Sequence, residues 1–364
     1  MSKLKVIISG GGTGGHIFPA IAIANALKTL RKDIEILFVG ANGKMEMEKV
    51  PAAGFEIIGL NITGINRSLT FSNLVFPFKL IGSLLKSFSI LRSFKPQVVI
   101  GVGGFASGPV LYAAQRKGIP TVIQEQNSYA GITNKKLGER AKRICVAYDG
   151  MDKFFPKDAI RLTGNPVRQD ILKMEGKKPR SIEHFGLTEG MRTILVIGGS
   201  LGARTLNHSI SAALEELNNS GLQIIWQTGK AFHAEALEKS KAMNNVKVYD
   251  FIQRMDLAYC VADLVISRAG ASSISELCIV GRPSILVPFP FAAEDHQTKN
   301  AQALTTHNAA IMIPDNQAQE KLVREALQLI NDSDRLEKLE VNVKKLAFNN
   351  ADKAIANEIL SLIP

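Results

Sequence analysis

Short apolar runs alternate with segments of helical periodicity along the whole chain. The first half opens with an apolar run at 5–8, a helical segment at 19–27 and a second apolar run at 34–39. Buried parallel strands are apolar throughout, because helices cover both faces of their sheet. The alternation therefore predicts a parallel sheet covered by helices. The other strands predicted in this half are 57–60, 97–100 and 121–124, and the other helices are 45–53 and 110–117.

The same alternation begins again at residue 193, after a connection at 161–168 that contains the breaker Asn165-Pro166. It predicts a second doubly wound unit, followed by closing helices, the last of which docks onto existing structure. The strands of this half are predicted at 193–197, 222–227, 246–249, 264–267 and 284–287. The helices are predicted at 204–217, 231–241, 255–262, 272–280, 319–330, 334–348 and 352–360.

Glycine-rich segments follow three predicted strands, at residues 10–15, 101–109 and 198–204. Glycine lets the backbone turn sharply and approach a ligand, and each segment precedes a helical stretch whose N-terminus attracts anions. The first loop lacks the Gly-Lys-Ser/Thr of a Walker A loop. Residues 39–42, after the second strand, lack the carboxylate of a dinucleotide site. We therefore predict phosphate or sugar recognition by backbone amides.

The net charge of +11 arises in the first part of the chain. Residues 1–160 hold 21 Lys and Arg against 10 Asp and Glu, whereas residues 161–364 hold 23 of each. Residues 57–124 contain no acidic side chain. This asymmetry indicates that the first half has an anionic partner.

The composition predicts a folded protein of a reducing compartment. With 364 residues, of which 46% are hydrophobic, the chain can form two α/β domains with separate cores. The cysteines at 145, 260 and 278 have no metal or redox spacing. We expect neither a signal peptide nor a spanning helix, and hence a cytosolic or peripheral protein.

Residues 69–94 are unusual in combining five phenylalanines with spaced basic residues. One interpretation is one or two helices that pack on the sheet with their basic side chains in water. The other exposes a patch to an anionic membrane, with apolar groups among the lipids and ammonium groups at the head groups. The sequence leaves both open. The patch would consist of Phe76, Phe78, Lys79 and Lys86.

Several polar residues beside the predicted loops could carry chemistry. His16 begins the first helix, whose positive end lowers the pKa of the imidazole and leaves it able to accept a proton, although it could also merely cap the helix. Glu276 follows Gly270 in a helix start, where it could accept hydrogen bonds from ribose hydroxyls or serve in capping. Polar clusters at 125–131 and 289–301 follow strands, where ligands bind. No acidic pair has metal spacing, so we expect no obligatory metal and no cofactor.

Seven motifs occur in order along nearly the whole chain. They are Gly-Gly-Gly-Thr-Gly-Gly-His at 10–16, Gly-Gly-Phe-Ala-Ser-Gly-Pro at 103–109, Glu-Gln-Asn at 125–127, Gly-Asn-Pro-Val-Arg at 164–168, Gly-Gly-Ser at 198–200, Gly270 with Glu276, and Asp-His-Gln at 295–297. This set resembles glycosyltransferase family 28, and within it the bacterial enzymes that add N-acetylglucosamine (GlcNAc) to a lipid-linked muramyl sugar.

The resemblance implies the GT-B fold, an α/β class in which two Rossmann-like doubly wound parallel-sheet domains face each other across a cleft. Residues 1–162 would form the acceptor-binding and membrane-facing domain. Residues 163–344 would bind UDP-GlcNAc, and the C-terminal helix, about 345–364, would pack back on the first domain.

The implied reaction is inverting transfer of GlcNAc from UDP-GlcNAc to the C4 hydroxyl of the muramyl-pentapeptide sugar of undecaprenyl-pyrophosphoryl lipid I. Its product would be lipid II, made for peptidoglycan at the cytoplasmic face of the inner membrane by a peripheral protein. The implied partners are UDP-GlcNAc, lipid I and an anionic membrane surface, with no nucleic acid.

The resemblance also implies site residues. The positions that resemble donor contacts are Thr13, Gly14, Gly15, Asn127, Arg168, Ser200, Ile252, Ala271, Ser272, Ser273, Glu276 and Gln297. Among these, Glu276 would bind the ribose, and residues 271–273 would place amides near the diphosphate. The acceptor side would include Gly103, Gly104, Phe105 and Ser107.

Two candidates remain for the base that takes the acceptor's proton, His16 first and Glu125 second, and positioning alone could supply part of the rate. Two other functions also remain open. A UDP-GlcNAc 2-epimerase would share the fold but need acidic residues around the sugar. A nucleotide-gated membrane-binding protein would bind UDP-sugar without turnover.

Overall fold

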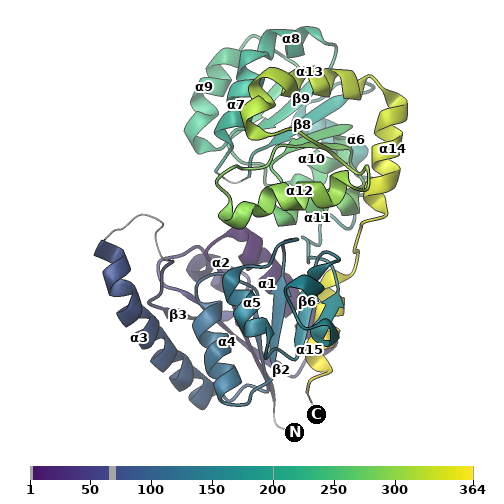
Figure 1. Cartoon of the computed structure of the whole chain (residues 1–364). Helices are drawn as coiled ribbons and strands as arrows, with labels where there is room; N and C mark the ends of the chain where they lie inside the picture. Colours follow the sequence, from purple (N-terminus) through teal and green to yellow (C-terminus); the bar gives the residue numbers. More distant parts are fainter. Residues whose placement is uncertain (1–2, 65–70, 200, 364) are drawn as a thin grey trace. The chain divides into compact units, whose positions relative to one another are not determined.

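The chain folds into two compact units, each built on its own parallel sheet (Figure 1). Unit 1 comprises residues 1–167 together with 350–364, and unit 2 comprises residues 168–349. The computed structural model describes residues 3–64, 71–199 and 201–363.

Seven parallel strands form the sheet of unit 1, in the order β3-β2-β1-β4-β5-β6-β7. Helices cover both faces, so consecutive side chains of the central strands are buried, as at Val6, Ile7 and Ile8. The strands are β1 Leu4–Ser9, β2 Ile34–Ala41, β3 Glu56–Leu60, β4 Val98–Gly101, β5 Thr121–Glu125, β6 Arg143–Val146 and β7 Ile160–Leu162.

Alternate side chains of β1 enter two separate cores. Val6 and Ile8 pack with α1 and α15, whereas Ile7 packs with α3 and α4 on the other face. Figure 1 shows α3, α4 and α5 together on one side of this sheet. The helices of unit 1 are α1 Gly14–Leu30, α2 Glu46–Ala52, α3 Phe71–Phe94, α4 Ser107–Arg116, α5 Ile132–Gly138 and α15 Ala351–Leu360, with 3₁₀ turns η1 Met151–Lys153 and η2 Lys157–Ala159.

The last helix, α15, belongs to the core of unit 1. Ile355 and Ile359 are fully buried against the face that carries α1. The Glu358 carboxylate pairs with Arg143 at 2.9 Å and with Arg161 at 3.5 Å, and so ties the helix to β6 and β7.

Within the phenylalanine-rich segment, Phe71–Phe94 form one continuous helix, α3, with Pro77 inside it. No helix in the described part of the chain combines the length and the apolarity that crossing a membrane requires.

Unit 2 contains six parallel strands in the order β10-β9-β8-β11-β12-β13. The single tryptophan of the chain, Trp226 in β9, is fully buried in its core. The strands are β8 Thr193–Ile197, β9 Gln223–Gln227, β10 Val246–Tyr249, β11 Leu264–Ser267, β12 Ser284–Leu286 and β13 Ile311–Met312. The helices are α6 Lys178–Phe185, α7 Arg204–Ala212, α8 Leu214–Asn219, α9 Lys230–Ser240, α10 Met255–Val261, α11 Ala271–Val280, α12 His296–Thr305, α13 Ala318–Ile330 and α14 Ser333–Lys344, with 3₁₀ turns η3 Ala293–Asp295 and η4 Asp315–Gln317.

The predicted class, two doubly wound parallel-sheet units, is confirmed. Strands β6, β7 and β13 were absent from the prediction. They contain only four, three and two residues, and Arg143 and Arg161 interrupt the apolar character of β6 and β7. Such short strands are recognisable mainly through their pairing with a neighbour, β5 in the case of β6.

Candidate active site

Each sheet has one point at which the strand order reverses, and glycine loops lie there. In unit 1 the chain leaves β1 toward β2 on one side and returns as β4 on the other, so the loops after β1 and β4 are adjacent. In unit 2 the same relation joins β8 and β11. Ligands of parallel sheets bind at these switch points, beyond the carboxyl ends of the strands.

The first two glycine loops touch backbone to backbone. The amide of Gly11 donates to the carbonyl of Gly103 at 3.2 Å. Gly104 has a φ of 86°, and a Cβ atom there would lie 2.3 Å from the carbonyl oxygen of Gly11. Glycine is therefore required at 104 both for its left-handed conformation and for this close approach.

His16 lies in the first turn of α1, which also contains Gly14 and Gly15 and is preceded by exposed Thr13. Its Nδ1 atom is 3.1 Å from the carbonyl oxygen of Gly11 and 3.3 Å from the Thr13 hydroxyl. A carbonyl oxygen can only accept, so we assign the proton of the neutral ring to Nδ1. This leaves the lone pair on Nε2, the atom that a base would use.

Glu125, the last residue of β5, is 2% exposed and accepts hydrogen bonds with both carboxylate oxygens. The donors are the backbone and side-chain nitrogens of Asn127 at 3.1 and 3.3 Å, the amide of Gly131 at 3.3 Å and the side chain of Asn134 at 2.8 Å. Burial raises the pKa of Glu125, and these donors counteract the rise. The carboxylate thus holds the loop between β5 and α5.

Asn165 of the 164–168 motif meets the 125–127 motif in unit 1. Asn165 accepts from the Gln124 side chain at 2.8 Å and donates to the carbonyl of Gln126 at 3.0 Å. On the acceptor side, the Ser107 hydroxyl donates to the carbonyl of Gly104 at 3.0 Å, whereas Phe105 is 46% exposed. Ser107 thus supports the second glycine loop.

In unit 2, the loop after β8 is joined to β9. The Gln227 side chain donates to the carbonyl of Gly199 at 2.9 Å and accepts from the amide of Ile252 at 2.8 Å. Ile252 is therefore fixed beside the glycine loop. Ser200, the remaining candidate in this loop, lies outside the described residues.

The first turn of α11 holds residues 271–273, and its N-cap is Gly270. One turn further, the Glu276 carboxylate forms a bidentate pair with Arg168, with two contacts of 3.0 Å. The hydroxyl of fully buried Tyr259 also donates to Glu276 at 3.0 Å, and burial raises the pKa of this hydroxyl well above its usual value. Amides for a phosphate and an oriented carboxylate thus lie on one helix.

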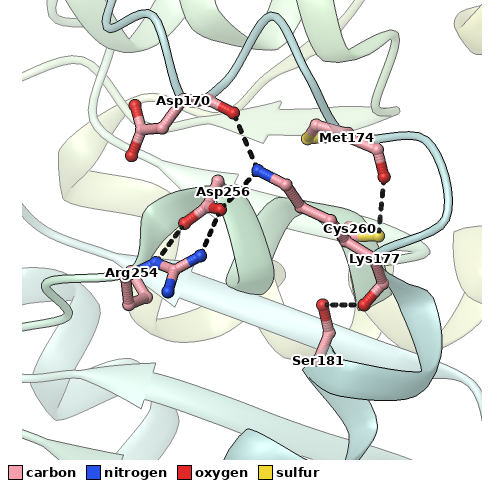
Figure 2. A network of polar contacts seen from close by, with 7 residues as sticks. All are labelled: Asp170, Met174, Lys177, Ser181, Arg254, Asp256 and Cys260. Carbon is pink, nitrogen blue, oxygen red and sulfur yellow. Dashed lines mark hydrogen bonds and ion pairs between the residues drawn. The ribbon is translucent and has the colours of Figure 1, made fainter.

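The segment from Asp170 to Lys177, which follows Arg168, is held by a buried carboxylate (Figure 2). Asp256, in the first turn of α10, is fully buried and pairs with Lys177 at 2.7 Å and with Arg254 at 2.8 and 2.7 Å. The Lys177 ammonium also donates to the carbonyl of Asp170 at 3.1 Å. In α12, Gln297 accepts from the amide of Phe289 at 2.9 Å and so supports the polar segment after β12.

The four residues of the patch predicted on α3 have different surroundings. Phe78 is 76% exposed, Phe76 lines a groove beside α4, and Lys79 is half-buried. The Lys86 ammonium, however, donates to the carbonyl of Gly59 at 2.8 Å and so bonds to the sheet. An exposed apolar stripe continues from Phe78 through Ile81 and Leu85, which are 57% and 66% exposed.

Sequence reasoning missed three residues that support these loops, namely Glu46, Gln227 and Tyr259. None lies in a recognisable motif. Each is recognisable only by what it touches in the folded chain.

Family models match both halves of the chain. The N-terminal domain model of glycosyltransferase family 28 matches residues 6–146, and the C-terminal domain model matches residues 193–357. The chain belongs to glycosyltransferase family 28. The family predicted from the motifs is therefore confirmed.

Family 28 relatives match the chain over its full length. A protein of Flavobacterium psychrophilum is 53% identical over 363 residues, which is 100% of this chain and 99% of the relative. A protein of Cytophaga hutchinsonii is 54% identical over 359 residues, 99% and 97% of the two chains. Both are named UDP-N-acetylglucosamine--N-acetylmuramyl-(pentapeptide) pyrophosphoryl-undecaprenol N-acetylglucosamine transferase.

Solved structures agree with this family. MurG of Acinetobacter baumannii has a TM-score of 0.80 at 28% identity, covering 98% of this chain and 99% of its own. The predicted GT-B fold class is thereby confirmed. A UDP-GlcNAc 2-epimerase of Neisseria meningitidis has a TM-score of 0.70 at 16% identity, covering 98% and 100%. At that identity the likeness concerns the fold alone.

Proposed function

We propose that this family 28 enzyme transfers GlcNAc from UDP-GlcNAc to the C4 hydroxyl of the muramyl-pentapeptide sugar of lipid I, with inversion, to give lipid II. The observation that carries the proposal is the 53% identity, over the whole chain, to a relative named for this reaction. The 2-epimerase alternative is supported only by a shared fold. The binding-protein alternative gives no role to the hydrogen bond that orients the His16 ring.

On the donor side, the leaving group is uridine diphosphate, whose negative charge grows as the bond to the sugar C1 breaks. The free amides in the first turn of α11 can stabilise that charge, because they are fixed before the reaction and need no reorganisation. Glu276 accepts from the ribose, with Tyr259 holding the carboxylate. Arg168 already contacts Glu276, and its guanidinium would pair with the diphosphate bound beside that carboxylate.

On the acceptor side, the C4 hydroxyl attacks C1 of GlcNAc and gives its proton to Nε2 of His16. The hydrogen bond from Nδ1 to Gly11 keeps Nε2 unprotonated before the reaction. Glu125 serves instead as a positioning residue, since both its oxygens already accept hydrogen bonds, one from Asn127 in the loop after β5 and the other from Asn134 in α5.

We further propose that α3 binds the anionic cytoplasmic surface of the inner membrane, so that the enzyme is peripheral. The stripe of Phe78, Ile81 and Leu85 offers apolar side chains. Beside it lies a groove of about 960 Å³ between α3, α4 and α5. The groove is lined by Leu80, Leu84 and Tyr112 among others, and its basic residues are Arg116, Lys136 and Arg140. Apolar side chains next to cations match the chemistry of a head-group region.

Replacing Leu85 by aspartate should weaken binding to anionic phospholipid vesicles about ten-fold or more. Burying a leucine side chain contributes about 1.5 to 3 kcal/mol, and aspartate adds repulsion. Cosedimentation measures the effect, and Leu237→Asp on exposed α9 is the matched control. Equal vesicle binding by the parent and the Leu85 variant would contradict the proposal that α3 binds the membrane.

The function is tested by transfer of labelled GlcNAc from UDP-GlcNAc to a short-chain lipid I analogue in the presence of EDTA. We expect a disaccharide product that depends on the acceptor, and EDTA tests the prediction of metal-free transfer. UDP binding without disaccharide would contradict the transferase. Sugar released or epimerised without acceptor would favour the epimerase.

A further inference from the structure

Glu46 is a buried carboxylate at the start of α2, and it lies against the first glycine loop. It is 1% exposed. One oxygen accepts from the amide of Gly12 at 2.8 Å, and the other accepts from the amide of Ala41, at the end of β2, at 2.9 Å. Glu46 therefore fixes the loop after β1 to the neighbouring strand.

The amide held by Glu46 belongs to the same peptide group that contacts His16. In the peptide between Gly11 and Gly12, the N–H donates to Glu46 and the C=O accepts from His16 Nδ1 at 3.1 Å. A peptide group is planar and rigid. One rigid group thus joins the carboxylate to the imidazole.

The surrounding backbone is shaped to admit this carboxylate. A Cβ atom on Gly11 would lie 2.2 Å from the Glu46 carboxyl carbon, and one on Gly40 would lie 2.6 Å from its Cγ. The glycines on both sides therefore leave the space that Glu46 fills.

We propose that Glu46 is a positioning residue for His16, acting through the Gly11–Gly12 peptide group to hold the imidazole with Nδ1 protonated and Nε2 ready to accept. The inference rests on the proposed function, in which His16 takes the acceptor's proton. It assigns to Glu46 the part that a buried aspartate plays by direct contact in serine-hydrolase triads.

The physical basis is polarisation along a hydrogen-bond chain. The carboxylate draws the Gly12 proton, which increases the negative charge on the Gly11 oxygen and strengthens its bond to Nδ1–H. When Nε2 takes a proton, the positive ring is stabilised by this oxygen and by the negative charge beyond it. Glu46 thereby makes His16 a stronger base, offsetting the opposite effect of the helix N-terminus.

Several other charged side chains on the elements around this loop have contacts of their own. Glu35 pairs with Lys5 and Glu48 with Lys49, while Lys28 lies over the ring of Phe55. The charged side chains on β1, β2, β3, α1, α2 and α15, besides Glu46, are Lys5, Lys28, Glu35, Glu48, Lys49, Glu56, Asp352, Lys353 and Glu358, and Lys86 reaches β3 from α3.

The test compares the parent with Glu46→Gln in the full chain, by nitrogen NMR of the histidine rings and by the pH dependence of transfer. The signal of His16 is assigned by its loss in His16→Ala. We expect the neutral ring of the parent to carry its proton on Nδ1. In Glu46→Gln, we expect a lower pKa of His16, an acid limb of kcat/KM moved to lower pH, and turnover reduced about ten-fold.

Glu48→Gln is the matched control, because it makes the same change on the same helix at an exposed position and should leave both readouts unaltered. A His16 pKa unchanged in Glu46→Gln, or a fall in turnover without movement of the acid limb, would overturn the proposal. A parent ring protonated on Nε2 would overturn it even if the variant did not fold. If the ring behaves as expected but the parent makes no disaccharide, the positioning role is supported and the transferase proposal fails.

Discussion

Replacing His16 by alanine is expected to lower kcat for GlcNAc transfer by about 100- to 10,000-fold, the usual contribution of a positioned general base. Without Nε2, the C4 hydroxyl must lose its proton to water while it attacks. The binding of UDP should change little, since the groups proposed for the ribose and diphosphate lie in unit 2. Single-turnover transfer with saturating donor measures the first quantity, and titration calorimetry with UDP measures the second.

The controls separate catalysis from folding. His307→Ala removes an exposed histidine from unit 2 and should transfer at the parent rate. Glu125→Gln tests the second candidate base. If Glu125 only holds the loop between β5 and α5, its replacement should raise KM for the acceptor more than it lowers kcat. If His16→Ala keeps kcat within a few-fold of the parent while Glu125→Gln loses it, Glu125 is the base and the assignment of His16 is wrong.

Replacing Asp256 by asparagine is expected to destabilise unit 2 by about 3 kcal/mol, near the lower end of the cost of breaking a buried ion pair. The change removes the charge between Lys177 and Arg254 and leaves two cations without their shared partner (Figure 2). Urea unfolding followed by the fluorescence of Trp226 reports on unit 2 alone, because this is the chain's only tryptophan. The midpoint should fall by on the order of 1 M.

The exposed pair of Lys239 and Glu235, with 50% and 48% exposed side chains, supplies the control. Glu235→Gln should cost less than about 1 kcal/mol. Similar midpoints for the Asp256 and Glu235 variants would show that the network in Figure 2 contributes no more than a surface pair.

The contribution of Asp256 to the stability of unit 2 should depend on pH. Hydrogen bonds from Arg254, then those from Lys177, hold the pKa of Asp256 well below its usual range, against the effect of burial. A carboxyl group whose pKa is lower in the folded state than in the unfolded state stabilises the folded state. The stabilisation is complete above the unfolded pKa of about 4, and it is lost as the pH falls towards and through the folded pKa. The stability difference between the parent and Asp256→Asn should therefore be constant near neutral pH and shrink below about pH 4.

The sequence by itself determined the fold class and the position of the loops. Apolar runs such as 193–197 and 264–267 became β8 and β11 because continuous apolar character is what a strand covered on both faces requires. The glycine loops followed from the same alternation, since they stand between a strand and a helix. The family followed from seven motifs in order. These are local properties, set by neighbours in the chain.

The tertiary structure alone decided which side chains act on those loops. Glu46 reaches a peptide 34 residues earlier, and Arg168 pairs with Glu276 across 108 residues. Lys86 of α3, predicted as part of the membrane patch, donates to the carbonyl of Gly59, 27 residues earlier. Such contacts depend on strand order and on the direction of each side chain, which no local pattern records. The Glu46 carboxylate contacts the Gly11–Gly12 peptide group, which His16 also contacts, only because β2 lies beside β1 in the folded sheet.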